Sequence, residues 1–359
     1  MSRPYAGRMD ARIDDPAAAI ASRVARILDW TRDAMGPAGP AATDLHVRLA
    51  ESSEGGKAFR GRLLLAAHVA CGGPEPDAAL DVAAALELFQ TAALIHDDVL
   101  DGSDLRRGRP AAHRVFEAAH RDAGWVGDAA AYGRAGAILA GDVALVAAQR
   151  ASTVAARRAG DRVADLFDEM AVLVTAGQHL DMRVAVSPLD ALPGLEGRIR
   201  QTMRSKTASY TAEFPLALGA AVAGADDAAV AALRAAGVPL GIAFQLRDDV
   251  LGVAGSPEVT GKPVGDDLRE GKRTLLVWHA TTRGSAAERE AVLAVLGRDD
   301  APVAAVEAAV EALRSSGALA FVETEIADHA ARARAALADA LPDATGVLTL
   351  VDAAVDRRR

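Results

Sequence analysis

The sequence predicts an all-α protein, and three observations favour that fold class. Of the 359 residues, 51% are hydrophobic but only 4% are aromatic, and alanine is frequent throughout. Alanine is the strongest helix former, so a core of Ala, Leu and Val favours closely packed helices. Two long apolar stretches with helical spacing, at 86–101 and 241–252, also each run into a pair of adjacent aspartates.

Apolar residues spaced three and four apart indicate where each helix lies. The expected helices cover residues 17–35, 42–51, 77–101, 132–158, 161–182, 195–222, 225–251 and 272–281, followed by short alanine-rich helices from 285 onward. Turns or loops are expected at 36–40, 71–76, 109–127, 186–194 and 253–271, where Gly, Pro and polar residues gather. We also expect Gly141 and Asp142 to interrupt the fourth helix. Residues 1–15 are predicted to be a disordered start, and 16–359 a single domain.

Composition and charge argue against several classes of function and location. The net charge of −9 argues against non-specific binding to nucleic acid. The single cysteine, Cys71, rules out an internal disulfide and suits a reducing cytoplasm. The N-terminal residues lack the apolar core of a signal peptide. No uncharged apolar run reaches 18 residues, so we expect no transmembrane helix and no stable membrane insertion. We therefore expect a cytoplasmic protein.

The stretch at 86–108 carries the clearest chemical pattern. It ends in Asp97, Asp98 and Asp101, and Arg106 and Arg107 follow at once. In a helix, Asp97 and Asp101 lie one turn apart, with carboxylates about 6 Å from each other. Carboxylates this close repel one another, and Mg²⁺ shared with phosphate oxygens relieves that repulsion. The pattern therefore predicts a magnesium-diphosphate site; the alternative is a solvated acidic helix end.

A second acidic stretch repeats the first. Asp248 and Asp249 follow another apolar helical run, and the letters D-D-V-L occur in both places. Two acidic helix ends that face each other across one cavity could hold several Mg²⁺ ions. The repeat indicates internal pseudo-symmetry within one helical bundle.

These stretches resemble the trans-isoprenyl diphosphate synthase family. Its D-D-x-x-D motif followed by R-R-G matches Asp97, Asp98, Asp101, Arg106, Arg107 and Gly108, and its F-Q-x-x-D-D motif matches Phe244, Gln245, Asp248 and Asp249. The resemblance extends from about residue 55 to 273. It implies an isoprenoid-synthase-type helical bundle around a central active-site cavity. It also implies a homodimer that joins isopentenyl diphosphate to an allylic diphosphate head to tail. The five aspartates would bind three Mg²⁺ ions, with Mn²⁺ able to substitute.

The residues around Lys57 resemble the family's isopentenyl diphosphate subsite. We expect a helix to start near Lys57, so that Lys57 and Arg60 share a face at its N-terminus. Cations there oppose the helix dipole, which favours a bound anion; the alternative is a solvated basic turn. In the family, G-G-K-x-x-R holds isopentenyl diphosphate together with Arg107, and a histidine often stands where this chain has Gln90. Here Gly61 replaces the usual proline.

The resemblance assigns further residues to the allylic substrate and its metals. G-Q-x-x-D matches Gln178 and Asp181, K-T matches Lys206 and Thr207, and G-K-P-x-G-x-D-L matches Lys262, Asp266 and Asp267. Arg106, Lys206 and Lys262 would complement the charge of the leaving diphosphate. The chain departs from the family at Gly252, where a third aspartate is common. His96 is interpreted as a hydrogen-bonded helix residue, not a metal ligand.

Product length is expected to depend on the helix before Asp97. Family members that stop at C15 commonly carry an aromatic residue four or five positions earlier, where this chain has Ala93 and Ala92. The next large side chain is Phe89, which eight residues at about 1.5 Å each put roughly 12 Å from the carboxylates. We therefore expect C20 geranylgeranyl diphosphate, with C25 or longer as the alternative, unless Phe89 packs outwards and limits nothing.

Two alternative functions would be compatible with some of the same motifs. A class I terpene cyclase ionises diphosphates with similar acidic motifs, but it needs no second diphosphate site and therefore no G-G-K-x-x-R element. A regulatory partner subunit of a prenyl synthase typically loses the acidic motifs, which this chain keeps apart from the position of Gly252.

Overall fold

A computed structural model describes residues 13–74, 76–255 and 264–356, and it confirms the all-α prediction. The helices are α1 (Pro16–Met35), α2 (Thr43–Ser53), α3 (Phe59–Ala70), α4 (Pro76–Asp101), α5 (Ala112–Asp122), α6 (Ala129–Ala159), α7 (Arg162–Ala185), α8 (Glu196–Thr202), α9 (Phe214–Val222), α10 (Asp227–Ala254), α12 (Asp266–Arg269), α13 (Leu275–Arg283), α14 (Ala286–Leu293), α15 (Val303–Ser315), α16 (Ala318–Ala340) and α17 (Thr345–Val355). Shorter elements are the 3₁₀ turns η1 (Gly36–Ala38), η2 (Pro40–Ala42) and η3 (Leu189–Gly194), the π-helix η4 (Met203–Glu213), and an antiparallel pair of two-residue strands, β1 (Leu105–Arg106) and β2 (Arg109–Pro110).

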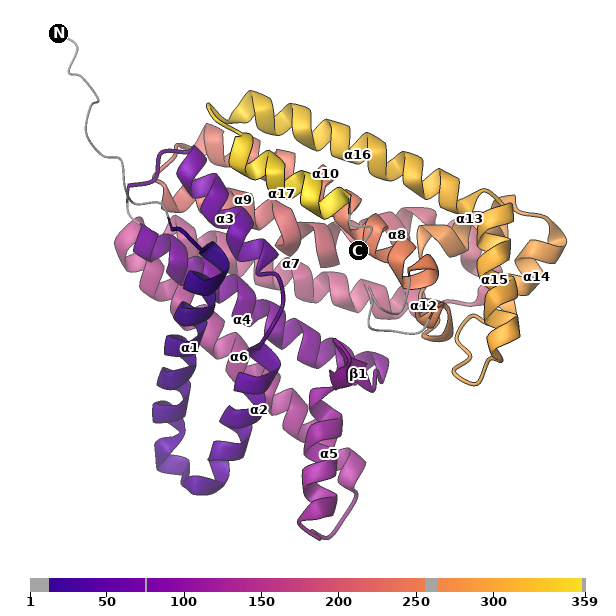
Figure 1. Ribbon diagram of the computed structural model, residues 1–359, viewed down its shortest axis with the longest axis horizontal. Coiled ribbons are helices and arrows are strands. Elements are labelled where there is room, and N and C mark those ends of the chain that lie inside the picture. The colour runs from indigo at the N-terminus through magenta and orange to yellow at the C-terminus, as the bar shows by residue number, and fades with distance from the viewer. Residues whose placement is uncertain (1–12, 75, 256–263, 357–359) are drawn as a thin grey trace.

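Two helix pairs carry the acidic stretches. Helix α4 packs along α6, and α10 packs along α16 and against η4. In Figure 1, α16 and α17 cover one side of the bundle, the α1–α2 pair and α5 extend from the opposite side, and α13 to α15 close one end. Both α4 and α10 therefore run inside the bundle and carry their aspartates at their C-terminal ends.

Small residues allow α4 and α6 to pack closely. Ala92 on α4 and Ala140 and Ala144 on α6 are fully buried. Gly141 also lies at this contact, because a Cβ atom there would fall 2.8 Å from Cε1 of His96. The expected break at Gly141 was wrong: α6 is continuous from Ala129 to Ala159, since the glycine admits a neighbouring ring without ending the helix.

Other local predictions also required correction. The expected loop at 109–127 contains α5, which buries His113, Phe116 and His120 along one face. The predicted helix at 195–222 includes an eleven-residue π-helix, and α16 has 23 residues although only short helices were expected near the end of the chain. Of the predicted disordered start, residues 1–12 lie outside the described part of the chain. The single-domain boundary at residue 16 stays a prediction.

Three helices are long and apolar enough to cross a membrane by length and composition alone. They are Pro76–Asp101, Ala129–Ala159 and Asp227–Ala254, whose most apolar stretches are 72%, 28% and 50% buried in the fold. None of these stretches is an uncharged run of 18 residues, because one or two charges interrupt each of them, so a search for uncharged runs does not find them. The absence of membrane insertion stays a prediction.

Candidate active site

Three predicted motifs meet at Asp97. Gln178 on α7 donates to Oδ1 of Asp97 at 2.9 Å, and Nζ of Lys206 on η4 lies 3.2 Å from the same atom. Nζ of Lys206 also donates to Oδ2 of Asp181 at 2.6 Å. The two neighbouring carboxylates raise the pKa of Lys206 against the opposing effect of burial. Residues more than 100 positions apart thus form one charged cluster at the end of α4.

Glycines position the π-helix that carries Lys206. A Cβ atom on Gly177 of α7 would fall 2.6 Å from Cα of Lys206. On α10, Cβ atoms at Gly237 and Gly241 would approach the backbone of Glu213 and Ala208 equally closely. The backbone of η4 is therefore clamped between α7 and α10. A π-helix is uncommon and frequently occurs at functional sites, and here it presents Lys206 to Asp97.

The side chain of Asp98 has different partners from that of Asp97. Its side chain is 3% exposed and accepts from Nε of Arg106 at 2.9 Å, with a second contact from the same guanidinium. Both residues line a cavity of about 150 Å³ bounded by α2, α4 and α5. Asp98 therefore holds Arg106 in place, and its predicted role as a metal ligand stays a prediction.

The second acidic motif also contains one buried carboxylate. Asp249 is 7% exposed and accepts from Nε2 of Gln245 at 2.6 Å. Burial, reinforced by the nearby charges of Asp267 and Asp248, raises the pKa of Asp249 to about 8. Asp248, the neighbouring motif residue, is half-buried. Gln245 thus orients the buried carboxylate, and its predicted contact with substrate stays a prediction.

A chain of contacts joins the ends of α4 and α10. Ser103, just after α4, donates to Oε1 of Glu270 at 3.2 Å. Lys272 pairs with both Glu270 and Asp267, at 2.7 and 2.9 Å, and Asp267 lies against Gly252 on α10. The two acidic helix ends therefore share one site. Glu270 and Lys272 were not predicted from the sequence, although the matched G-K-P-x-G-x-D-L stretch continues directly into them.

The donor groups suit a divalent cation bound together with a diphosphate. Partial burial and the neighbouring charge of Asp97 raise the pKa of Asp101 to about 6, which indicates crowded carboxylates. Among the residues that the structure describes, no three acidic, His or Cys side chains form a closed ligand group. Mg²⁺ commonly uses one or two carboxylates and completes its shell with water and phosphate oxygens, so an open arrangement fits it.

The basic residues near Lys57 are arranged differently from the prediction. Helix α3 begins at Phe59, and Ala58 has the left-handed φ of 46°. Lys57 is therefore an exposed loop residue and shares no helix face with Arg60. Arg60 is 6% exposed, lies 4.0 Å above the ring of Tyr210 and donates to Thr211 at 2.9 Å. The expectation of two cations side by side on one helix turn was wrong, because the left-handed residue separates them.

Three further residues surround Arg60. The amide oxygen of Gln90 accepts from Arg60. Glu87 accepts from the backbone N–H of Gly61 at 3.1 Å, and burial raises its pKa against the attraction of Arg60. Arg107 donates to the carbonyl oxygen of Glu54 at 3.0 Å. These contacts gather the predicted isopentenyl diphosphate residues at the start of α3.

Glycine is required beside Arg107. Gly56 has a φ of 88°, and a Cβ atom there would lie 3.0 Å from the Arg107 guanidinium. The G-G of the basic motif therefore supplies both a left-handed turn and room for the arginine.

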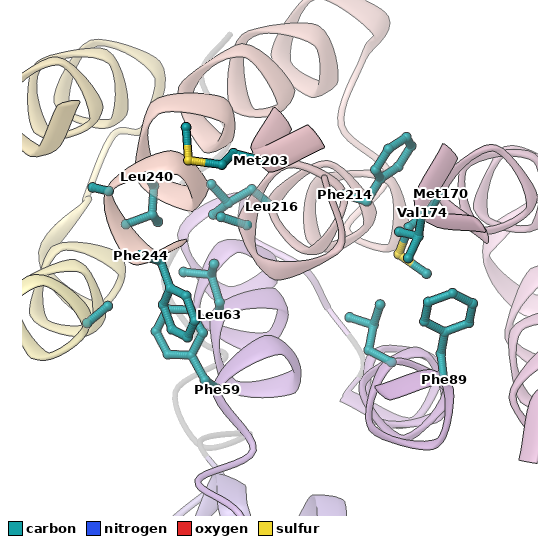
Figure 2. Packing of buried hydrophobic residues seen from close by; sticks show 14 of the residues in the cluster. Phe59, Leu63, Phe89, Met170, Val174, Met203, Phe214, Leu216, Leu240 and Phe244 are labelled. Atoms are coloured by element: carbon teal, nitrogen blue, oxygen red, sulfur yellow. The ribbon is translucent and has the colours of Figure 1, made fainter. Parts of the chain in front are cut away.

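Several assigned residues line the interior. Phe244 is buried, and its ring lies against that of Phe59, as Figure 2 shows; the ring centroids are 5.3 Å apart. It therefore links α10 to the start of α3. Thr207 is buried within η4. His96 lies 3.1 Å from the carbonyl oxygen of Ile138, which agrees with a hydrogen-bonded helix residue. Lys262 lies outside the described residues.

Phe89 points into the bundle. Its ring makes edge contacts with Phe167 and Tyr210, each with centroids 6.1 Å apart, and Figure 2 shows it directed towards Met170 and Val174 of α7. Phe89 therefore packs against α7 and η4, and its role in product length stays a prediction. Helix geometry puts Ala93 on the same face as Phe89 and Asp97. Ala92 shares the face of His96, which contacts α6.

Comparison with known proteins agrees with these motifs. The polyprenyl synthetase family model matches residues 47–313. The chain is 39% identical over 312 residues to the geranylgeranyl diphosphate synthase of Mycobacterium tuberculosis, covering 83% of this chain and 78% of that protein. It is 33% identical over 347 residues to the nonaprenyl diphosphate synthase of the same organism, covering 95% and 94%.

The fold agrees as well. A crystal structure of geranylgeranyl pyrophosphate synthase from Corynebacterium glutamicum, complexed with isoprenyl diphosphate and magnesium, superposes with a TM-score of 0.90 at 35% identity and covers 97% of this chain and 100% of that one. The family model spans most of the chain, and the acidic and basic motifs lie together in the fold. The chain therefore belongs to the polyprenyl synthetase family, and it is a trans-isoprenyl diphosphate synthase.

Proposed function

We propose that the enzyme condenses isopentenyl diphosphate with an allylic diphosphate to give geranylgeranyl diphosphate, the C20 product, in a Mg²⁺-dependent reaction. The observation that carries the chain length is the inward position of Phe89, whose ring contacts Phe167 and Tyr210. The relatives are named for products of different length. The product length of this chain therefore has to be inferred from its own residues.

The allylic diphosphate is assigned to the cluster around Asp97. Asp97, Asp101 and Asp248 would hold three Mg²⁺ ions, or Mn²⁺ in their place. Bound there, the metal stabilises the negative charge of the leaving diphosphate. Lys206, 3.2 Å from Asp97, adds positive charge where the allylic C–O bond ionises. The buried Asp98 keeps Arg106 oriented for the same purpose.

Isopentenyl diphosphate is assigned to Lys57, Arg60 and Arg107. Nε of Arg60 is buried, and no group among the described residues accepts a hydrogen bond from it. A buried donor without an acceptor is costly, so an anion at this position would stabilise it. The double bond of the substrate then attacks the allylic cation. The released proton passes to the departing diphosphate, since none of the motif residues is an evident general base.

We also propose that the enzyme is a cytoplasmic homodimer. Helix α6 exposes Ile138, Leu139 and Val146, which are 44%, 55% and 58% exposed, and α7 exposes Val172. A row of exposed apolar side chains on two neighbouring helices is typical of a subunit interface. Light scattering should give twice the monomer mass of 37.0 kDa. A monomer at micromolar concentration would contradict the dimer.

A product assay tests the proposed reaction. The purified chain is incubated with isopentenyl diphosphate and, in turn, the C5, C10 and C15 allylic diphosphates, and the products are separated by mass. We expect C20 to dominate with each primer. A predominantly C15 product, or a much longer one, would contradict the length assignment. A cyclic hydrocarbon formed without isopentenyl diphosphate would instead indicate a terpene cyclase, and lack of turnover would indicate a regulatory subunit.

A further inference from the structure

A long π-helix lies beside both proposed substrate subsites. Element η4 runs for eleven residues from Met203 to Glu213, and the backbone N–H of Phe214 donates to the carbonyl oxygen of Ser209, five residues back. Most π-helices are single turns. Hydrogen bonds of this kind lengthen the turn to roughly 4.4 residues, against about 3.6 in an α-helix. The direction of each side chain on η4 therefore depends on this π register.

Both subsites contact side chains of η4. Nζ of Lys206 lies 3.2 Å from Oδ1 of Asp97, and Oγ1 of Thr211 accepts from Arg60 at 2.9 Å. Lys206 and Thr211 are five residues apart, so the π register separates their directions by roughly 50°. In an α-helix the same spacing would separate them by about 140°, and one of the two contacts would be lost. The π register thus lets one helix serve both subsites.

An ion pair within η4 depends on the same register. Arg204 and Glu213 stand nine residues apart, and their side chains pair. Nine residues make about two turns of a π-helix, which brings both side chains to one face. They make about two and a half turns of an α-helix, which would put the side chains on opposite faces. The pair can therefore form only while η4 keeps the π register.

Glu213 also ties the end of η4 to both neighbouring helices. Its side chain is 1% exposed and accepts from Nε of Arg234 on α10 at 2.8 Å. Nη1 of Arg234 in turn donates to Glu169 on α7 at 3.0 Å. Removing one partner of a buried ion pair leaves an uncompensated charge, which is costly. A shift of η4 out of the π register would carry this cost, because Arg204 could no longer reach Glu213.

We propose that Glu213 and Arg204 are positioning residues that lock the π register of η4. This register in turn places Lys206 and Thr211 at the two subsites. The inference goes beyond the proposed function, but it rests on the assignment of Lys206 and Arg60 to the two substrates. In the competing account, the glycines of α7 and α10 fix the register alone, and the ion pairs only add stability.

Two arginines of similar exposure provide the test. Arg204→Gln removes the pair within η4, where the arginine side chain is 34% exposed. Arg200→Gln is the matched control, because Arg200 on α8 is 36% exposed and pairs with Glu325 of α16. In crystal structures, Arg204→Gln should return part of η4 to i→i+4 hydrogen bonds and move Lys206 out of contact with Asp97. Arg200→Gln should keep the π-helix and that contact.

Steady-state kinetics measures the consequence for each substrate. Arg204→Gln should lower kcat/KM for both substrates by about 10-fold or more, because a displacement of about 1 Å can cost about 100-fold. Lys206→Ala should mainly impair the allylic substrate, so a loss for both substrates distinguishes a change of register from loss of the lysine. Arg200→Gln should match the wild type. Arg204→Lys, which keeps the charge, should recover most of the activity.

The outcomes separate the two accounts. An unchanged π-helix in Arg204→Gln, with Lys206 still beside Asp97, would overturn the inference and support the competing account. Equal kinetic losses in Arg204→Gln and Arg200→Gln would overturn it as well, because they indicate an effect of stability alone. Glu213→Gln, a change of nearly equal size, tests the same pair from its other side and should shift the register in the same way.

Failure of the substrate assignment gives a different result. If Lys206→Ala leaves the kinetics of the allylic substrate unchanged, the proposed role of Lys206 fails. The crystal structures of Arg204→Gln and Glu213→Gln still decide whether the ion pair sets the register of η4.

Discussion

The two acidic motifs reach similar composition by different constructions. The first lies on one helix, α4, and cations from other elements balance it: Lys206 at Asp97 and Arg106 at Asp98. The second places Asp249 in the interior, where Gln245 orients it, and Asp267 of α12 lies against Gly252. The two D-D-V-L stretches are identical in sequence, but their aspartates have different partners in the fold. The buried carboxylate of the first motif, Asp98, pairs with an arginine, whereas that of the second, Asp249, accepts from an amide.

The largest effect is expected when one aspartate is removed from each acidic motif in turn. Asp97→Ala and Asp248→Ala should each lower kcat by at least about 100-fold, because each carboxylate helps to hold the metal that stabilises the leaving group. Excess chelator should abolish turnover by the wild type. The melting temperature should change by less than about 3 °C, since neither residue belongs to the buried core. Full activity in either variant would contradict the mechanism.

A second pair of variants separates the substrates. Lys57→Ala should raise the KM for isopentenyl diphosphate by about 10-fold, and Lys206→Ala should mainly impair the allylic substrate. Lys57 is an exposed loop residue, while Lys206 lies between Asp97 and Asp181. Initial rates measured with each substrate varied in turn give the comparison. If both variants affect both substrates equally, the assignment of two subsites is wrong.

A third comparison tests whether Asp97 and Asp98 have different roles within the first motif. Asp98→Asn should lower the free energy of unfolding by about 2 kcal/mol, because it removes a charged, buried partner of Arg106. Asp97→Asn should have little effect on stability. Denaturant unfolding of both variants measures the difference. Equal stability of the two would show that Asp98 does not hold Arg106, and would restore it as a candidate metal ligand.

The sequence predicted the parts of the site that lie on regular helices. Periodic apolar residues located α4 and α10, and their last turns carried the aspartates to the expected ends. The motif spacing also brought Gln178 and Lys206 to Asp97. Here local pattern and tertiary structure agree, which is why prediction succeeded.

Prediction failed where backbone geometry departs from the local pattern. Nothing in the spacing of apolar residues signals the π-helix, which the glycines of α7 and α10 stabilise from outside. The left-handed Ala58 separated Lys57 from α3, and alanine carries no turn signal. The contact between Asp267 and Gly252 joins two segments across 15 positions of the sequence. In each case the decisive contact comes from another element of the fold.

The smallest expected effect concerns product length, and it depends on which face of α4 a side chain occupies. Ala93 lies on the face of Asp97 and Phe89, so Ala93→Phe should fill the space above Phe89 and shorten the product from C20 to C15. Phe89→Ala should extend it beyond C20. The sequence also suggested Ala92→Phe as a shortening change. However, Ala92 is fully buried, and its helix position directs it towards α6.

Ala92→Phe is therefore the matched comparison for Ala93→Phe. It should cost about 1–3 kcal/mol of stability through overpacking, with the remaining folded enzyme still making C20. Product mass and denaturant unfolding, measured on the same preparations, separate the two alanines. A C15 product from Ala92→Phe with wild-type stability would show that this position faces the growing chain. If neither Ala93→Phe nor Phe89→Ala changes the product, the end of the cavity is set by another helix. The inward ring of Phe89 would then serve only to pack against Phe167 and Tyr210.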